Sequence, residues 1–152
     1  SKEDATEDFL DRFDLPEVDG ELTFENYMAK NRVAGERTIL QGNMYGFLEP
    51  LEATSLGFYR IICRQAWDAI FHIKSLDECN TEVRRVMKEL ENVTLWHYQY
   101  GSKYDTPFWE YAKSLPFKPD KRFDMMIDNP ESTEMYGQWE GWNFKNWKEG
   151  ME

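Results

Sequence analysis

The stretch ATSLGFYRIICRQAWDAIFHI, residues 53–73, decides the fold that we predict for this chain. Its apolar side chains recur at spacings of three and four residues, which is the period of an amphipathic α-helix. Thr54 or Ser55 can cap the start of this helix, because a hydroxyl oxygen accepts hydrogen bonds from the amide N–H groups of the first turn. The stretch therefore predicts a helix that packs through one face.

A second helix is predicted from Asn80, a favourable N-cap residue, to Tyr100, with Gly101 ending it. It carries one apolar stripe, on which we interpret His97 as a hydrogen-bonded core residue. We expect the two helices to pack as an antiparallel pair. The residues expected at their interface are Phe58, Ile62, Trp67 and Phe71 on the first helix, with Val83, Met87 and Leu90 on the second.

The remaining segments predict shorter elements. Residues 37–41, RTILQ, are predicted to form a short strand. A third helix is predicted to start at Thr106 with Pro107 as its first helical residue, the position that proline favours. Phe108, Ala112 and Leu115 would then face inward. Residues 116–131, with three prolines, are interpreted as irregular. The expected fold class is mainly α with a short strand-and-loop entry.

Composition limits the possible functions. The chain has 152 residues, a net charge of -11 and 16% aromatic residues. No apolar run reaches the roughly 20 residues that span a bilayer, so we expect no membrane partner. The acidic charge also argues against a nucleic-acid partner, because binding phosphates requires Lys and Arg. With two cysteines and no signal peptide, we expect a cytoplasmic protein.

Charge and motif patterns suggest a division of the chain. Residues 1–22 carry nine acidic and two basic side chains, and are interpreted as an acidic, loosely held segment. The sequence has no Gly-x-Gly, no CxxC and no HExxH, so no dinucleotide fingerprint or metal site is predicted. Asp68 and His72, one helical turn apart, are interpreted as a surface pair. Cys63 and Cys79 are interpreted as packed thiols.

The segment GNMYGFLEPLEATS, residues 42–55, is the most informative for function. It is a glycine-containing loop that leads a carboxylate, Glu52, to the start of the first long helix. Amide N–H groups at a helix start form an anion site, here at Thr54 and Ser55. From the residues alone, Glu52 is either a partner of the helix dipole or a functional group beside the anion.

This segment resembles the halide-site segment of flavin-dependent halogenases of the tryptophan halogenase family. The stretch WHYQYGSKYDTPFW, residues 96–109, resembles the substrate helix of that family, and FKNWKEGM, residues 144–151, resembles a later segment. The resemblance implies that residues 23–51 are a remnant of the flavin-domain strand and the halide loop. Residues 52–152 would be the helical substrate-binding domain, without the Rossmann-like flavin domain of the family.

The resemblance also implies a set of roles. Glu52 matches the catalytic glutamate, and Thr54 and Ser55 match the amides that hold chloride or bromide. In the family, reduced FAD (FADH2) and dioxygen oxidise the halide to hypohalous acid, which reaches an aromatic substrate. Tyr98, with Tyr100, matches the paired tyrosines, while Phe108 and Trp109 match the aromatic pair beside the substrate. Tyr104 stands where the family has a glutamate for the substrate amine, so an aromatic compound other than tryptophan is an equal candidate.

Three hypotheses remain open from the sequence. The chain is a halogenase portion that acts on an electron-rich, indole-like substrate and is inactive by itself; it is a non-catalytic helical interaction module; or it derives from a flavin monooxygenase relative without halide binding. The expected partners are an aromatic small molecule, the missing flavin domain and a second copy in a homodimer.

Overall fold

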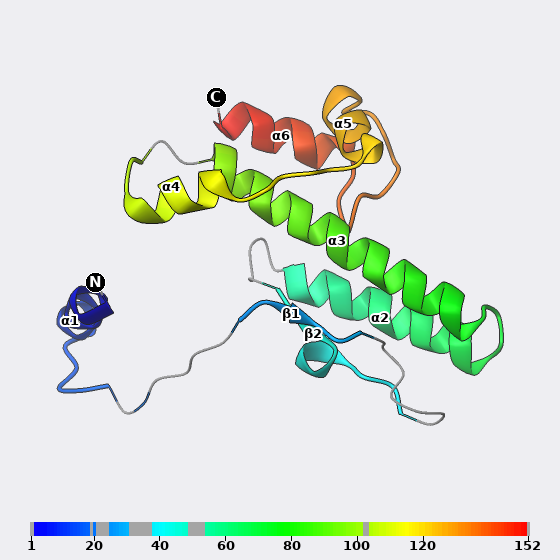
Figure 1. Ribbon diagram of the computed structural model, residues 1–152, viewed down its shortest axis with the longest axis horizontal. Helices are drawn as coiled ribbons and strands as arrows, with labels where there is room; N and C mark the ends of the chain where they lie inside the picture. The colour runs from blue at the N-terminus through cyan, green and yellow to red at the C-terminus, as the bar shows by residue number, and fades with distance from the viewer. Residues whose placement is uncertain are drawn as a thin grey trace.

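The computed structural model describes residues 2–18, 20, 25–30, 38–48, 54–101 and 104–151, and these confirm the mainly helical fold class (Figure 1). The described residues form six α-helices, one 3-10 turn η1 (Gly42–Met44) and a two-stranded antiparallel sheet, β1 (Tyr27–Met28) with β2 (Gly46–Phe47). The helices are α1 (Lys2–Phe13), α2 (Thr54–Ile70), α3 (Leu76–Tyr100), α4 (Pro107–Ser114), α5 (Lys121–Asp128) and α6 (Gly141–Met151).

Helices α2 and α3 lie side by side and antiparallel, joined by the turn at residues 71–75 (Figure 1). Phe58 and Ile62 are buried at this interface, together with the three α3 residues predicted to meet them. Trp67 and Phe71 were predicted there wrongly, because both rings are more than half exposed and contact each other at 4.2 Å. Trp67 follows Phe58 by two and a half helical turns, which places it on the opposite face of α2.

Helix α3 begins earlier than its sequence predicts. Ser75 is the N-cap, and its hydroxyl accepts a hydrogen bond from the Glu78 N–H at 3.2 Å. The Glu78 carboxylate accepts one in return from the Ser75 N–H at 2.8 Å, completing a capping box. This backbone hydrogen bond lowers the pKa of Glu78. Asn80, the predicted cap, is instead buried within the helix, whereas the predicted end at Gly101 is confirmed.

Two further segments differ from the predictions. Of the strand expected at 37–41, residues 38–41 belong to neither β1 nor β2, and Arg37 lies outside the described residues. The segment 116–131 contains α5, because the Asp120 side chain caps the amides of Arg122 and Phe123. The start of α4 at Pro107 after Thr106 is confirmed, and Ala112 faces inward as predicted.

The second half of the core is aromatic. The ring of Trp96 on α3 stacks on that of Phe144 on α6 at 5.7 Å and meets that of Phe123 on α5 edge-on at 5.4 Å. Tyr136, in the loop between α5 and α6, is fully buried against both phenylalanines. These rings hold α5 and α6 against the C-terminal half of α3, where α4 also packs.

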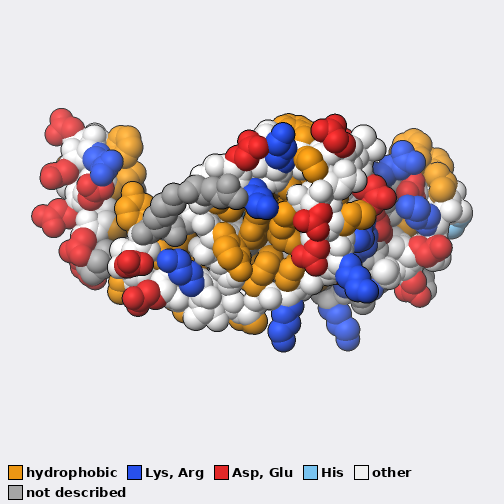
Figure 2. Space-filling view, turned by 90° about the horizontal axis from the view of Figure 1, so that it is seen from above, with side chains coloured by type: hydrophobic (Ala, Val, Ile, Leu, Met, Phe, Trp, Pro, Cys, Tyr) orange, Lys and Arg blue, Asp and Glu red, His pale blue; other side chains and the backbone are white. Residues whose placement is uncertain are grey.

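The acidic N-terminal segment contains a helix that its charge pattern does not predict. Helix α1 lies apart from the body in Figure 1, and Figure 2 shows its acidic side chains gathered at the left end of the molecule. Phe9 and Phe13 contact each other at 4.9 Å and remain largely exposed. None of the helices in the described ranges has the length and hydrophobicity that crossing a membrane requires.

Candidate functional site

A groove of about 370 Å³ lies between the C-terminal half of α3, helix α4 and the end of β2. Apolar and aromatic side chains dominate its walls, which is typical of sites that bind small molecules. Two of the five aromatic residues that the sequence assigns to the substrate, Tyr98 and Phe108, line it. The full set of lining residues is Asn26, Leu48, Glu91, Thr94, Leu95, Tyr98, Phe108, Tyr111, Ala112 and Leu115.

The groove keeps its shape because α4 is hydrogen-bonded to α3. The side-chain amide of Gln99 donates to the carbonyl of Ala112 at 3.2 Å and to that of Leu115 at 2.6 Å. These carbonyls lie in the last turn of α4 and at its C-cap, where helix carbonyls lack the usual i+4 amide partner, and the Ala112 carbonyl also accepts the N–H of Leu115 at 3.2 Å. Gln99 therefore fixes the wall that carries Phe108 and Tyr111.

The rings at the groove contact one another mainly edge-on. The ring centroids of Tyr98 and Phe108 are 5.9 Å apart at an interplanar angle of 75°, and those of Phe108 and Trp109 are 5.0 Å apart at 80°. Phe108 is 56% exposed, so its predicted inward position on α4 is wrong, although one side of the ring lines the groove. An aromatic ligand in the groove could contact the edges and faces of these rings.

The other predicted aromatic residues lie outside the groove lining. Trp109 contacts the ring of Tyr98, with ring centroids 5.7 Å apart, but does not line the groove. Tyr100 packs against Phe117 at 6.3 Å, and Tyr104 is exposed. Sequence reasoning also missed Thr94 and Glu91, although both precede Tyr98 by about one or two helical turns, on the same face of α3.

The predicted halide site is only partly described. Glu52 and its neighbours 49–51 and 53 lie outside the described residues. Thr54 is buried at the start of α2 and Ser55 is partly buried, in the turn whose amides point away from the helix. The preceding loop is held in place by the hydrogen bond from the Ala29 N–H to the Tyr45 carbonyl, at 2.7 Å.

The described residues near this loop do not fit a flavin. A dinucleotide site needs glycines at the start of the helix that let the pyrophosphate approach the backbone. Gly57, in the first turn of α2, is the glycine in that place, but a Cβ there would overlap the side chain of Gln138. The close approach that Gly57 allows is therefore used within the chain, and together with the missing Gly-x-Gly fingerprint this leaves no flavin cradle in the described part.

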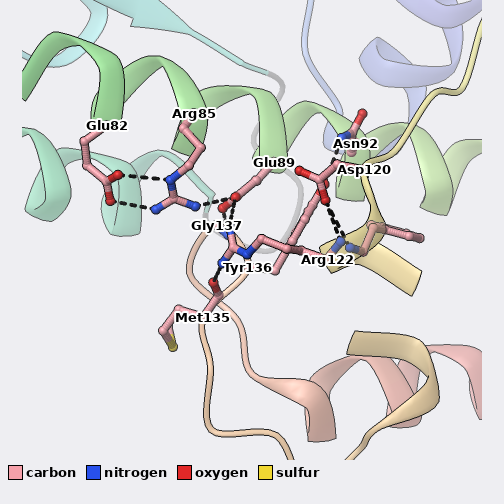
Figure 3. A network of polar contacts seen from close by, with 10 residues as sticks. Glu82, Arg85, Glu89, Asn92, Asp120, Arg122, Met135, Tyr136 and Gly137 are labelled. Carbon is pink, nitrogen blue, oxygen red and sulfur yellow. Dashed lines mark hydrogen bonds and ion pairs between the residues drawn. The ribbon is translucent and has the colours of Figure 1, made fainter. Parts of the chain in front are cut away.

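A buried polar network lies on the other side of α3, centred on Glu89 (Figure 3). Glu89 is 2% exposed, and its carboxylate accepts hydrogen bonds from the guanidinium groups of Arg85 and Arg122. It also accepts one from the Gly137 N–H at 2.7 Å. Arg122 further donates to the Met135 carbonyl at 2.5 Å. The network thus ties the turn at residues 135–137 and the start of α5 to the middle of α3.

Tyr136 extends this network into the core. Its hydroxyl accepts a hydrogen bond from the side-chain amide of Asn92 at 2.9 Å. Burial raises the pKa of Tyr136 to about 12, because the charged phenolate loses its solvation. The group is therefore neutral at physiological pH and serves as a structural hydrogen-bond acceptor.

Several lesser candidates have structural explanations. Asp68 is buried, not on the surface as predicted, and its carboxylate pairs with Arg64 at 3.1 Å and Lys74 at 3.3 Å. His72, two residues after the end of α2, has a positive φ of 55°, and within the described ranges no ion pair joins it to Asp68. Cys63 is exposed, contrary to prediction, whereas Cys79 is buried.

His97 has the hydrogen bond predicted for it, between Nδ1 and the Val93 carbonyl at 2.8 Å. Its ring also meets that of Trp147 at 4.7 Å, which joins α3 to α6. Within the described ranges, no group of three or more His, Cys, Asp or Glu side chains is placed to hold a metal ion.

Comparison with known proteins places this chain in a family. The tryptophan halogenase family model matches residues 1–151, so the chain belongs to that family. No curated protein sequence matches the chain. Among the solved structures that are similar to it in fold are two tryptophan halogenases.

The first is a thermophilic tryptophan halogenase (Th-Hal) from Streptomycin violaceusniger, with a TM-score of 0.67 and 21% identity, covering 95% of this chain and 31% of that chain. The second is a tryptophan 6-halogenase (SttH) from Streptomyces toxytricini, with a TM-score of 0.63 and 19% identity over the same shares of the two chains. The chain thus spans about a third of the length of these structures.

Proposed function

We propose that this chain forms the substrate-binding and halide-site portion of a flavin-dependent halogenase that acts on an electron-rich, indole-like aromatic compound. One observation carries the proposal: Tyr98 and Phe108, which the family resemblance assigns to the substrate, line one groove. The membership of the chain in the tryptophan halogenase family supports the same conclusion.

In the proposed reaction, the groove holds the aromatic ring while hypohalous acid delivers the halogen. A carbon–halogen bond forms at the ring, the oxygen–halogen bond breaks, and the proton from that ring carbon leaves with the released hydroxide as water. Tyr98 and Phe108 would orient the ring, because aromatic pairs favour offset or edge-on contact. Glu52 would accept or relay the ring proton as a general base.

The halide, chloride or bromide, is a substrate in this proposal and would bind at the start of α2. Amides of a first helical turn favour an anion through both their N–H groups and the helix dipole. Thr54 and Ser55 supply this turn.

The reaction requires FAD in its reduced form, and the described residues provide no cradle for it. We therefore propose a flavin-binding domain as the partner of this chain, which would be inactive without it. The apolar side chains exposed at the α2–α3 turn, seen at the right end of Figure 2, are available for an interface; they are Trp67, Ile70, Phe71, Ile73 and Leu76.

In the absence of a flavin-binding domain, we propose that the same face joins two copies of the chain in a homodimer. Sedimentation velocity tests this point, since Trp67→Glu with Phe71→Glu should convert the dimer to a monomer. Phe9→Glu, on an exposed ring of α1, is the control and should leave the dimer intact. A wild-type monomer at high concentration would contradict the proposal of a homodimer.

The proposed activity is tested in a polypeptide that joins this chain to a flavin-binding domain of the family. Halogenation of a panel of indoles is measured with chloride or bromide and reduced FAD. Glu52→Gln should lower the rate by about 10²–10⁴-fold, the usual effect of losing a general base. Tyr98→Ala should raise KM, whereas Trp142→Ala, an exposed ring on α6, should change neither constant.

A Glu52→Gln variant that keeps more than a third of the wild-type rate would limit Glu52 to a partner of the helix dipole. A non-catalytic interaction module is the second candidate, favoured by the exposed apolar face at the α2–α3 turn. It is supported if the joined polypeptide binds flavin and halogenates no member of the panel.

A further inference from the structure

We propose that the hydroxyl of Thr94 is the polar recognition point of the groove, and that the groove selects neutral or cationic aromatic ligands with an N–H or O–H donor over ligands with a carboxylate. This inference deepens the proposed function and rests on it, because it uses the same groove between α3 and α4. It assigns a specificity-determining role to a residue that the sequence patterns do not single out.

The hydroxyl of Thr94 is buried without a hydrogen-bond partner among the described residues. The residue is 6% exposed, and its oxygen is inaccessible to solvent. A threonine within a helix usually bonds the carbonyl one turn earlier, and this one does not. A buried hydroxyl without a partner is destabilising, so this atom gains most from a ligand that hydrogen-bonds it.

Thr94 lies in the wall of the groove, so a rotation of its side chain would bring the buried hydroxyl to a ligand there. Thr94 lines the groove one helical turn before Tyr98, and Glu91 lines it nearly one turn before Thr94. Leu48 from the end of β2 and Phe108 from α4 complete the apolar walls around them. A flat ring between these walls would place a ring N–H or O–H beside the α3 face.

The charge of the groove favours a donor over an acid. Among the described lining residues, Glu91 alone has a carboxyl group, and neither Lys nor Arg is present. The Glu91 carboxylate pairs with Lys88 at 3.1 Å, and Lys88 is not in the lining. A ligand carboxylate in the groove would lose water and meet no cation, which is unfavourable. A ligand amine would meet a carboxylate.

The expected change in affinity is that of one hydrogen bond between the ligand and the Thr94 hydroxyl. Loss of one such bond typically weakens binding by about 2- to 10-fold. Indole and 1-methylindole differ by the N–H donor and one methyl group, so the ratio of their dissociation constants reports this bond. Replacing Thr94 by valine keeps the shape of the side chain and removes the hydroxyl, so this ratio should fall toward one.

The experiment uses the chain with its leucine methyl groups labelled for NMR, because Leu48, Leu95 and Leu115 line the groove. Indole, 1-methylindole, tryptamine and indole-3-acetate are titrated into wild type, Thr94→Val and Thr81→Val. Thr81, exposed on the same helix and outside the groove, is the matched control. Thermal unfolding of each variant shows that it is folded, and Thr94→Val should raise Tm because a buried unpaired hydroxyl is removed.

We expect wild type and Thr81→Val to bind indole and tryptamine more tightly than 1-methylindole, and indole-3-acetate most weakly. Equal ratios of indole to 1-methylindole in wild type and Thr94→Val overturn the role of Thr94 and leave the proposed function standing. Binding of indole-3-acetate as tight as that of indole overturns the selection against carboxylates. If no ligand shifts the groove methyls, both this inference and the proposed substrate groove fail.

Discussion

Replacing the buried carboxylate of Glu89 by an amide tests the network that ties three parts of the chain together. In Glu89→Gln, the guanidinium groups of Arg85 and Arg122 lose the negative charge that they share. The Gly137 N–H, 2.7 Å from the second carboxylate oxygen, also faces a rotatable amide in place of a fixed acceptor. The amide must direct its own donors at a site where all three neighbours are donors.

The loss of unfolding free energy expected for Glu89→Gln depends on how deeply Glu89 and its two arginine partners are buried. Removing one partner of a fully buried ion pair costs about 3–5 kcal/mol in unfolding free energy. Here Glu89 is 2% exposed, but the side chains of Arg85 and Arg122 are 39% and 37% exposed, so water solvates part of the charge left behind. Arg85 also keeps its pair with Glu82 at 2.6 Å. We therefore expect a loss of about 2–3 kcal/mol.

Urea unfolding followed by tryptophan fluorescence measures this loss. Glu149→Gln, at an exposed 4.0 Å pair with Lys145, is the control and should change stability by less than about 0.5 kcal/mol. Amide hydrogen exchange at Gly137 should accelerate in Glu89→Gln and not in the control. A loss below about 1 kcal/mol with unchanged exchange at Gly137 would refute the reasoning, because it would mean that Glu89 stabilises no more than an average hydrogen bond.

Three further predictions concern the core. Leu90→Ala should cost about 2–5 kcal/mol by chemical denaturation, while Leu56→Ala on an exposed site should cost under about 0.5; similar values would place Leu90 outside the core. Gly137→Ala should lower Tm strongly, because φ at this residue is +62° and the new Cβ would lie 2.7 Å from Leu90 Cδ2. In the control Gly150→Ala, the new Cβ would have no atom within 4 Å. A wild-type Tm for Gly137→Ala would contradict this packing. In absorbance titration, Tyr136 should ionise near pH 12. Because tyrosines of the unfolded chain ionise near pH 10, the free energy of unfolding should fall between pH 10 and 12. Ionisation of all eight tyrosines near pH 10 would contradict the burial of Tyr136.

Much of the helical framework could be predicted from local signals. The period of α2 and of α3 shows which positions can share a face, and Gly101 and Pro107 mark where one helix ends and the next begins. The start of α3 was missed because Asn80 resembles a cap as well as Ser75 does. The deciding factor is the reciprocal bond with Glu78, a pairing that the sequence offers but does not rank.

The site was predictable in part. The resemblance to the halogenase family selected Tyr98 and Phe108, and the structure brings these two to one groove. It could not select Thr94, since a threonine in a helix carries no sign of whether its hydroxyl is bonded. It also gave no reason to exclude Tyr100 from the groove. That exclusion follows from the packing of Tyr100 against Phe117, in a segment interpreted as irregular.

The amino-acid sequence by itself determined the family, the helical class and the chemistry available, because motifs and periodicity are local properties of the chain. The tertiary structure alone decided which faces are covered: Phe58 is buried and Trp67 is exposed, although both are aromatic residues of one helix. It also decided that Glu89, which looks like a surface charge on α3, meets Arg122 and Gly137, 33 and 48 residues further along the chain. The physical reason is that burial and ion pairing depend on contacts between distant segments, which no local pattern specifies.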